Sequence, residues 1–460
     1  MFDAAATTLE ALQPLRVTGR VAAVKGLSVL VQDLPLPVGS LVRVERAAGG
    51  TVLMAEVVGF AGQQTVIMSL GQTGGIAVGD RAVGLHAARS ALVGSALLGR
   101  VVNGLAEPID GLGPIYGTRP VGIDPPPRAA TERVRVTEPL MTGVSALDLM
   151  TTLGRGQRLG VFAGPGVGKS TLLGSIAKGT AADVVVLALI GERGREVQDF
   201  LHGVLGAEGL KRAVVVASTG DESPLMRIRA ALTAAAIAEY FRDQGRHVLL
   251  MMDSVTRFAQ AQRQVGLAAG EPPASKGYTP SVFAGMSRLL ERAGQFASSV
   301  PGAPSGSVTG LYTVLVEGDD MTEPVADAAR GILDGHVILS RTLAQRGHFP
   351  AIDVLDSISR CADDVCTSAH TEARRVLVRT LAAYRESEDI IQIGAYARGS
   401  SAATDAAIEF TPRINAILQQ GRGERVGFER VREQAQRLAG EIQARLGSAT
   451  PSARAAMGKK

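Results

Sequence analysis

The hydrophobic pattern of this chain changes its spacing along the sequence, and each change predicts a different kind of structure. Between residues 16 and 90, short apolar runs are separated by Gly, Pro and Asp at roughly ten-residue intervals, which is typical of a small β-barrel or sandwich. The strands predicted there lie in the segments RVTGRVAAVKG, SVLVQD, SLVRVERAAGG, TVLMAEVVGF, QTVIMSL and DRAVGL.

From about residue 140, strand-like apolar runs alternate with helical stretches, of which residues 222–245 are the clearest. Linkers rich in Gly and Pro, at 99–104 and 123–127, precede this region. Such alternation predicts a mainly parallel sheet with helices on both faces. The predicted strands are 157–163, 183–190, 213–218, 247–253, 310–317 and 336–340.

The two ends of the chain follow different patterns. Strand signals stop after Cys361, and residues 364–460 have the Arg, Glu, Ala and Leu content of helices, with a predicted disordered stub from Ala449. A short amphipathic helix is predicted before the first strand, from the helical spacing of Phe2, Ala5, Leu9 and Leu12.

Composition and charge argue against a nucleic-acid partner. Tryptophan is absent, aromatic residues make up only 4%, and Phe60 is the sole aromatic between residues 16 and 90, so no base-stacking surface is expected. The net charge is +4, but residues 421–460 hold nine Lys and Arg against four Glu, a balance of +5 that leaves −1 for the rest. The basic character therefore belongs to the C-terminal region, which is expected to be a solvated helix face.

The cysteines and the apolar runs indicate the cellular compartment in which the protein is expected. Cys361 and Cys366 are too few for a disulfide scaffold or a Cys-rich zinc site, even with His370 nearby, so we expect partly buried free thiols in a reducing compartment. The first residues lack the basic start and apolar core of a signal peptide, and the longest clear apolar run, 184–190, is strand-sized. These features predict a soluble cytosolic protein.

The most informative segment runs from a predicted strand through a glycine-rich turn into a helix that starts at Lys169. The backbone N–H groups of such a loop surround the β- and γ-phosphates of a nucleotide, Lys169 would neutralise the terminal phosphates and Ser170 would ligate Mg²⁺. Ala163 occupies the first glycine position of the motif, which suits the end of a strand if its φ stays negative. The predicted phosphate-binding residues are Gly164, Pro165, Gly166, Val167, Gly168, Lys169, Ser170 and Thr171.

Two carboxylates complete a predicted triphosphatase site. Asp253 ends the apolar run 248–252 and would hold Mg²⁺ opposite Ser170. Residue 254 is Ser, so the water-activating base is not beside the metal carboxylate. Glu192, in the segment IGERGRE after the preceding strand, is the candidate base, although this alternation of charges also resembles a surface cluster. A dinucleotide-binding loop fits less well, because its glycine spacing differs and it has no use for Lys-Ser.

These segments together resemble the rotary and hexameric ATPase family that includes the F-type synthase α and β subunits. The resemblance rests on residues 163–170, GERGREV, LLMMDSVTRFA and PAIDVLDSISR. Within that family, residues 270–294, 313–341 and 393–400 look most like the flagellar and type III secretion export ATPases, and the similarity covers roughly residues 16–435.

The resemblance implies a role for each matching residue. Lys169 would contact the β- and γ-phosphates, Ser170 and Asp253 would hold Mg²⁺, and Glu192 would be the catalytic base. Arg193 would tether the γ-phosphate region, and Phe349 would stack on adenine. Arg360 would be the arginine finger that reaches the site of a neighbouring subunit. Ala163 and Ala106 depart from residues common in the family, and neither touches this chemistry.

The fold class expected from pattern and resemblance together is multidomain α/β. It comprises an N-terminal β-barrel domain with a short leading helix, a central RecA-like phosphate-loop domain with a mainly parallel sheet, and a C-terminal helical domain. Their expected ranges are 1–92, 93–363 and 364–460.

The resemblance implies an ATPase with ATP and Mg²⁺ as cofactors, acting in a homohexamer that energises flagellar protein export. The implied partners are a stator-like regulator at the N-terminus, export gate components and cargo–chaperone complexes, with no nucleic acid and with membrane contact only through partners. The implied location is the cytoplasm, at the export apparatus of the inner membrane.

Three alternatives stay open at this point. A virulence secretion ATPase would share the chemistry and differ in cargo. A non-catalytic ring subunit would not need both Glu192 and Arg360. An RNA translocase of the transcription-termination type shares the core architecture, but the few aromatics between residues 16 and 90 oppose it.

Overall fold

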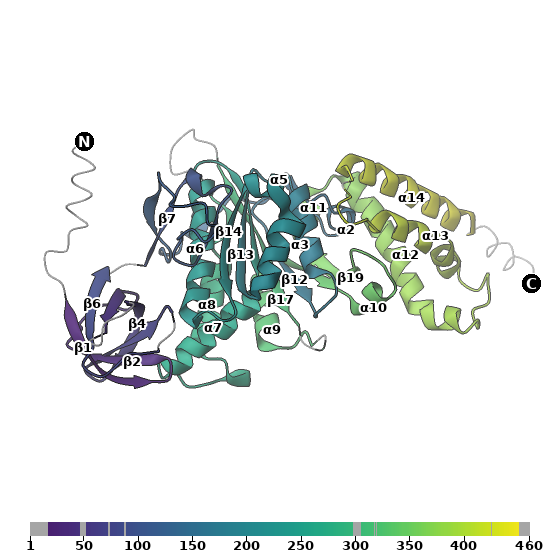
Figure 1. Cartoon of the computed structure of the whole chain (residues 1–460). Helices are drawn as coiled ribbons and strands as arrows, with labels where there is room; N and C mark the ends of the chain where they lie inside the picture. The colour runs from purple at the N-terminus through teal and green to yellow at the C-terminus, as the bar shows by residue number, and fades with distance from the viewer. Residues whose placement is uncertain are drawn as a thin grey trace, which may run out of the picture.

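The computed structural model describes residues 17–46, 52–71, 74–86, 89–297, 305–316, 318, 320–424 and 426–449. The predicted N-terminal amphipathic helix and the predicted stub after Ala449 lie outside these residues. In Figure 1 a small β-domain lies at one end, a sheet flanked by helices in the middle and a group of helices at the other end.

The strands of the first part close into a barrel in the order β1-β2-β5-β4-β3-β6. Side chains alternate between its two faces, as in β3, where Val42 and Val44 are fully buried and Leu41 and Arg43 are only half-buried. The N-terminal β-barrel expected from pattern and resemblance is therefore confirmed. Its strands are β1 (Thr18–Lys25), β2 (Ser28–Gln32), β3 (Leu41–Glu45), β4 (Leu53–Ala61), β5 (Gln64–Ser69) and β6 (Arg81–His86).

Within the described residues the central sheet has nine strands, in the order β19-β18-β12-β17-β15-β13-β14-β8 with β16 beside β17. All neighbours are parallel except the pairs β18–β19 and β16–β17. Its strands are β8 (Val101–Val102), β12 (Arg158–Ala163), β13 (Val184–Glu192), β14 (Ala213–Thr219), β15 (His247–Asp253), β16 (Gly294–Gln295), β17 (Ser307–Leu315), β18 (Gly335–Leu339) and β19 (Ile352–Ser359).

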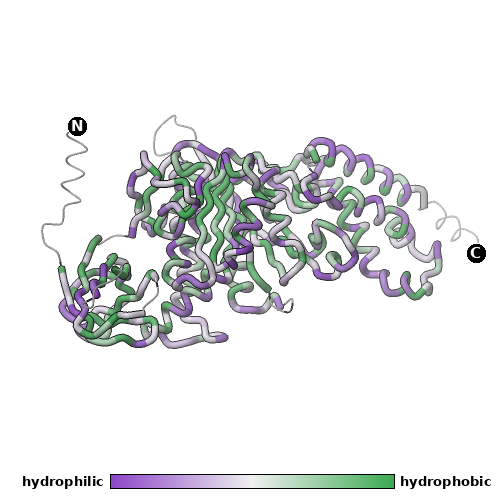
Figure 2. The backbone as a smooth tube through the Cα atoms, viewed as in Figure 1, coloured by the Kyte–Doolittle hydropathy of each residue, from purple (hydrophilic) through white to green (hydrophobic). Residues whose placement is uncertain are grey.

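Two separate hydrophobic cores lie on the two faces of this sheet. In β13, Val184, Val186 and Ala188 belong to one core, whereas Val185 and Leu187 belong to the other. This period of two on a strand buried on both sides explains its unbroken apolar run, which is visible in the hydrophobic central strands of Figure 2. The mainly parallel sheet predicted from sequence is therefore confirmed.

Helices cover both faces of this sheet. Helices α6 to α8 pack on one face, and α2, α3 and the C-terminal helices share the core of the other. The C-terminal helices are thus joined to the face that carries the phosphate loop. The α-helices are α2 (Ser145–Met150), α3 (Lys169–Gly179), α4 (Gly194–Gln198), α5 (Gly206–Lys211), α6 (Pro224–Arg242), α7 (Val255–Ala268), α8 (Pro280–Leu290), α9 (Pro324–Ile332), α10 (Arg341–Gln345), α11 (Ala362–Val365), α12 (Ser368–Gln392), α13 (Ala402–Leu418) and α14 (Phe428–Ala449).

The remaining elements are short and connect these parts. A π-helix, Asp199–Leu205, lies between α4 and α5. The small strands are β7 (Ser90–Val93), β9 (Arg119–Gly122), β10 (Pro139–Leu140) and β11 (Leu153–Gly154). Among the described residues, no helix has the length and apolar character that crossing a membrane requires.

A buried ionic cluster joins the barrel to the central part. Glu56 of β4 pairs with Arg229 of α6 at 2.7 Å and also with Arg89 of the connecting segment, and both Glu56 and Arg229 are almost completely buried. Removing one partner of such a pair leaves a buried charge uncompensated, which typically costs about 3–5 kcal/mol. The barrel is therefore fixed to α6 through ionic contacts that depend on each other.

Candidate active site

The glycine-rich loop has the backbone that its sequence predicts. Ala163 is the buried last residue of β12 and keeps a negative φ, so the missing glycine at this position has no conformational consequence. Gly166 and Gly168 have φ values of 77° and 96°, a region that other residues rarely adopt. The helix α3 starts at Lys169, as predicted.

The first turn of α3 is not capped by a side chain. Its N-cap is Gly168, whereas α6, α7 and α13 each begin with a serine whose hydroxyl accepts a backbone N–H. The first N–H groups of a helix have no partner within it, and together with the helix dipole they favour an anion. The start of α3 is therefore suited to a phosphate group.

Lys169, Glu192 and Asp253 meet at the edge of the sheet where the parallel strands end. The Lys169 Nζ lies 2.5 Å from Asp253 Oδ1 and 3.5 Å from Glu192 Oε1. Thr313 of the adjacent β17 donates its hydroxyl to Asp253 Oδ1 at 2.6 Å. Three residues that lie far apart in the sequence thus form one cluster because β12, β13 and β15 run in the same direction.

Burial changes the acidity of two of these groups in different ways. Burial raises the pKa of Glu192 to about 7; Lys169 opposes this increase and Asp253 adds to it. For Lys169, burial alone would lower the pKa, but Asp253 and Glu192 outweigh it and hold the pKa above its usual value. A cationic lysine beside a carboxyl group that titrates near neutral pH suits phosphate binding and proton acceptance.

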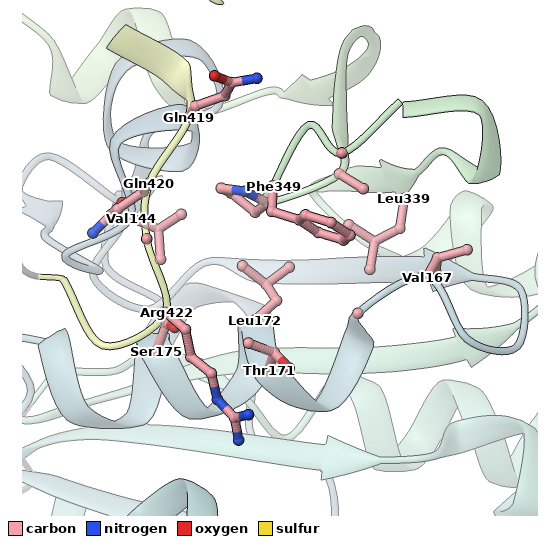
Figure 3. Close-up of a pocket in the computed structure, with 15 residues that line it drawn as sticks. Val144, Val167, Thr171, Leu172, Ser175, Leu339, Phe349, Gln419, Gln420 and Arg422 are labelled. Atoms are coloured by element: carbon pink, nitrogen blue, oxygen red, sulfur yellow. The ribbon is translucent and has the colours of Figure 1, made fainter. Parts of the chain in front are cut away.

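A cavity of about 570 Å³ extends from the phosphate loop toward the C-terminal helices. In Figure 3 the Phe349 ring projects into it, facing Leu172 and Thr171 of α3, and the segment carrying Gln419, Gln420 and Arg422 forms the opposite wall. The Phe349 side chain is 47% exposed, so its ring is available to a ligand. The predicted adenine-stacking residue therefore borders a cavity next to the phosphate loop.

Gln420, in the wall of the cavity opposite α3, forms hydrogen bonds that hold this wall in place. Its Nε2 donates to Gly143 O at 2.9 Å, its Oε1 accepts from Ser145 N at 3.0 Å, and its backbone N donates to Phe349 O at 2.9 Å. The segment after α13 is thereby tied to both the start of α2 and the predicted adenine contact.

We expect the substitution Phe349→Ala to raise the KM for ATP about tenfold and to leave kcat nearly unchanged, because stacking on a base contributes about 1–3 kcal/mol. Phe349→Tyr keeps a flat ring and should behave like the unmodified protein. Steady-state phosphate release over a range of ATP concentrations separates the two constants. An unchanged KM in Phe349→Ala would place the base elsewhere.

The structure does not bring the two predicted arginines into this cluster. Arg193 is 88% exposed, and its guanidinium lies 3.6 Å from Glu196. Arg360 follows β19, which runs antiparallel to β18, so that Ser359 pairs with Gly335 at the edge of the sheet opposite the phosphate loop. The Arg360 N–H donates to the backbone oxygen of Asp334, a residue that pairs with Arg158 at the start of β12. About 17 Å of strand separates Arg158 from Ala163, the last residue of β12. Arg360 therefore lies outside the site of its own chain.

Two arginines that the sequence did not single out lie against Gly191, the residue before Glu192. A Cβ placed on Gly191 would lie 3.0 Å from Arg257 Cβ and 3.5 Å from Arg227 Cδ, and Gly191 has a φ of 68°. Arg257 and Arg227 donate to the amide oxygens of Gln260 and Gln264. Arg257 lies in the first turn of α7, shortly after Asp253, which is a local signal for its position, whereas Arg227 has no such signal.

The cysteine prediction agrees with the structure. Cys361 and Cys366 are half-buried free thiols, and burial raises the pKa of Cys361 to about 11. His370 is buried, and its Nε2 lies 2.8 Å from Leu149 O, which gives this ring a structural partner.

The fold and the site define a class: a phosphate-loop ATPase whose parallel sheet carries the lysine, the acidic strand end and the candidate base at one edge. Residues 143–359 match the ATP synthase alpha/beta family, nucleotide-binding domain, and residues 366–437 match the T3SS EscN ATPase C-terminal domain. The chain is an ATPase.

Relatives that match nearly the whole chain identify the family within this class. It is 52% identical to the flagellum-specific ATP synthase of Treponema pallidum, over 91% of this chain and 92% of that protein. It is 46% identical to the type 3 secretion system ATPase of Xanthomonas euvesicatoria, over 90% and 92%. The assembled ATPase EscN from enteropathogenic E. coli superposes with a TM-score of 0.85 at 40% identity, over 92% of this chain and all of EscN. EscN in complex with its central stalk EscO gives 0.83 at 39% identity, with the same coverage. The chain belongs to the family of flagellum-specific and type III secretion ATPases.

Proposed function

We propose that the protein hydrolyses Mg-ATP at sites between the subunits of a homohexameric ring, and that this hydrolysis energises flagellar protein export. In each site one subunit supplies the phosphate loop, Lys169 and the base Glu192, and Arg193 tethers the γ-phosphate region. The neighbouring subunit supplies Arg360 as the arginine finger. These roles match the charge that develops on the γ-phosphoryl oxygens during transfer.

The residues present fit a magnesium ion held mainly by phosphate and water oxygens. Ser170 follows Lys169 directly, and the Asp253 carboxylate is within 2.5 Å of the Lys169 Nζ. A hydroxyl and one carboxylate are a typical protein contribution to nucleotide-bound Mg²⁺. Ser170 and Asp253 would hold the ion, which would supply positive charge at the terminal phosphates, while Lys169 keeps Asp253 and Glu192 near them.

The placement of Arg360 carries the proposal that the site lies between subunits. An arginine about 17 Å of strand from its own phosphate loop cannot reach a nucleotide bound there, so a role in phosphoryl transfer requires the site of a neighbouring subunit. The relative EscN has been solved in assembled form, which supports a ring for this chain as well.

The flagellum-specific relatives are 47–52% identical to this chain and the type 3 secretion system ATPases 44–46%, a small difference that supports the flagellar role in our proposal. In a flagellar apparatus the ATPase would act in the cytoplasm, associated with the inner membrane through its partners. These partners would be a stator-like regulator at the N-terminus, a central stalk comparable to EscO, export gate components and cargo–chaperone complexes.

Deleting the gene in its source organism tests this role. We expect the deletion to remove flagellar proteins from the culture medium and to abolish swimming. Plasmid-borne protein should restore both, whereas the Lys169→Ala variant, produced at the same level, should restore neither. Normal swimming of the deletion strain would rule out the flagellar assignment, and loss of virulence effectors alone would favour the alternative.

A further inference from the structure

Ser359, the last residue of β19, and Arg360, which follows it, are held by a polar network around the buried Gln157. The Arg360 N–H donates to Asp334 O at 2.9 Å, and the Ser359 hydroxyl donates to Thr152 O at 2.9 Å. The residue that joins these contacts is Gln157, whose Nε2 donates to Ser359 Oγ at 2.9 Å and more weakly to Asp334 O at 3.3 Å. Two consecutive residues are thus held at the base of the finger, Ser359 through its hydroxyl and Arg360 through its backbone N–H.

Gln157 is fully buried, and its hydrogen bonds hold the side-chain amide in one orientation. Its Oε1 accepts the Gly154 N–H at 2.8 Å, which fixes the orientation of the amide and directs Nε2 toward Ser359 and Asp334. A buried amide with all its polar atoms bonded is a rigid support, because any other orientation would leave a polar atom unpaired at a cost of about 1–3 kcal/mol.

The same support continues into β12, the strand that ends at the phosphate loop. Arg158, the first residue of β12, holds the Asp334 carboxylate through its Nε, one terminal nitrogen and its backbone N–H, at 2.9–3.0 Å. Asp334 N–H in turn donates to Arg158 O at 2.9 Å. One end of β12 therefore carries the chain's own phosphate loop and the other end carries the support of its finger.

We propose that Gln157 is a positioning residue for Arg360, and that it acts on the active site of the neighbouring subunit rather than on its own. This inference rests on the proposed function, in which Arg360 reaches across the subunit boundary. Gln157 lies about 20 Å of strand from Ala163, too far to contact a nucleotide on the same chain. A displacement of about 1 Å in a catalytic group typically costs about 10²-fold in rate.

The test compares two variants of this network with a matched control. Gln157→Ala removes the support, and Ser359→Ala removes only the hydroxyl through which Gln157 reaches the finger strand, so it is the milder change. We expect Gln157→Ala to reduce kcat about 10²-fold and Ser359→Ala to reduce it by a smaller factor. Binding of a fluorescent ATP analogue should stay unchanged in both. Thr233→Val also removes one buried hydrogen bond, from Thr233 to Gly104 O, but far from the finger, and should leave kcat unchanged.

Mixed rings separate a positioning role from a merely structural one. The readout is Mg-ADP trapped with aluminium fluoride, a mimic of the transferring phosphoryl group that reports on single sites. Alone, Gln157→Ala and Ser359→Ala should trap little, and Lys169→Ala none. Mixed with Lys169→Ala, which contributes an intact finger, both should regain trapping, because their own phosphate loops are intact.

The outcomes distinguish the two proposals. If Arg360→Ala regains trapping when it is mixed with Lys169→Ala but the Gln157 and Ser359 variants do not, the inference about Gln157 is overturned and the shared site stands. If Arg360→Ala regains none, the shared site is overturned and the inference falls with it. A loss of kcat in Thr233→Val equal to that of Ser359→Ala would also contradict the inference, since the effect would then be one of stability alone.

Discussion

Replacing Arg360 by alanine is expected to reduce ATP turnover by about 10³- to 10⁵-fold, which is the usual contribution of an arginine finger. ATP binding should remain intact, because Arg360 lies at the edge of the sheet opposite the phosphate loop of its own chain. The guanidinium acts only when charge spreads over the γ-phosphoryl oxygens in the transition state. Removing it should therefore lower kcat and leave the affinity for ATP unchanged.

Phosphate release and equilibrium binding of a fluorescent ATP analogue measure these two quantities separately. The control is Arg437→Ala, an arginine of α14 that is 79% exposed and whose contact with Glu433 is a surface ion pair at 3.9 Å. This control should hydrolyse ATP normally. Normal turnover in Arg360→Ala would show that the finger is not Arg360, and weakened ATP binding would show that Arg360 acts in its own chain's site.

The conformation of the phosphate loop can be predicted from the sequence because it depends only on residues within the loop. Gly166 and Gly168 adopt positive φ, and Lys169 begins the helix, so the pattern of residues alone determines the geometry. Glu192 and Asp253 were also predicted in advance, since each ends an apolar strand and parallel strands end at the same edge.

The far wall of the nucleotide cavity could not be predicted in this way. Gln419, Gln420 and Arg422 come from a segment some 250 residues after the loop, and only the packing of the C-terminal helices on the α3 face brings them there. Arg227 of α6 likewise lies against Gly191, the residue before Glu192, and nothing in the local sequence marks it.

The direction of strand β19 determines where Arg360, the functional residue of its motif, is placed. Residues 350–360 were identified by resemblance and not as a strand, and their functional arginine is placed by the antiparallel pairing with β18. Had β19 run parallel to β18, Arg360 would lie beside the phosphate loop of its own chain. The proposal of a site shared between subunits therefore depends on a strand direction that residue patterns do not specify.

Glu192→Gln is expected to bind Mg-ATP and to lose hydrolysis by about 10²- to 10⁴-fold, which is the usual contribution of a general base. The substitution keeps the shape of the side chain and removes its capacity to accept a proton from water. Glu192 lies 3.5 Å from the Lys169 Nζ, so the substitution also removes a negative charge close to the predicted position of the phosphates. Affinity for ATP should therefore be unchanged or higher, since less negative charge opposes the nucleotide.

Single-turnover hydrolysis of bound ATP measures the chemical step of this variant without product release. Glu208→Gln is the control, because Glu208 is 85% exposed on α5 and contacts only Lys211 among the ion pairs found in the described chain. If Glu192→Gln hydrolysed ATP at the rate of the unmodified protein, the base would lie elsewhere. Its neighbours Lys169 and Asp253 would then hold Glu192 only as a charge partner, and the pKa of about 7 that burial gives this carboxyl would have no catalytic role. Loss of hydrolysis with retained or tighter binding instead assigns proton acceptance to the one carboxylate of the cluster that is not held by Thr313.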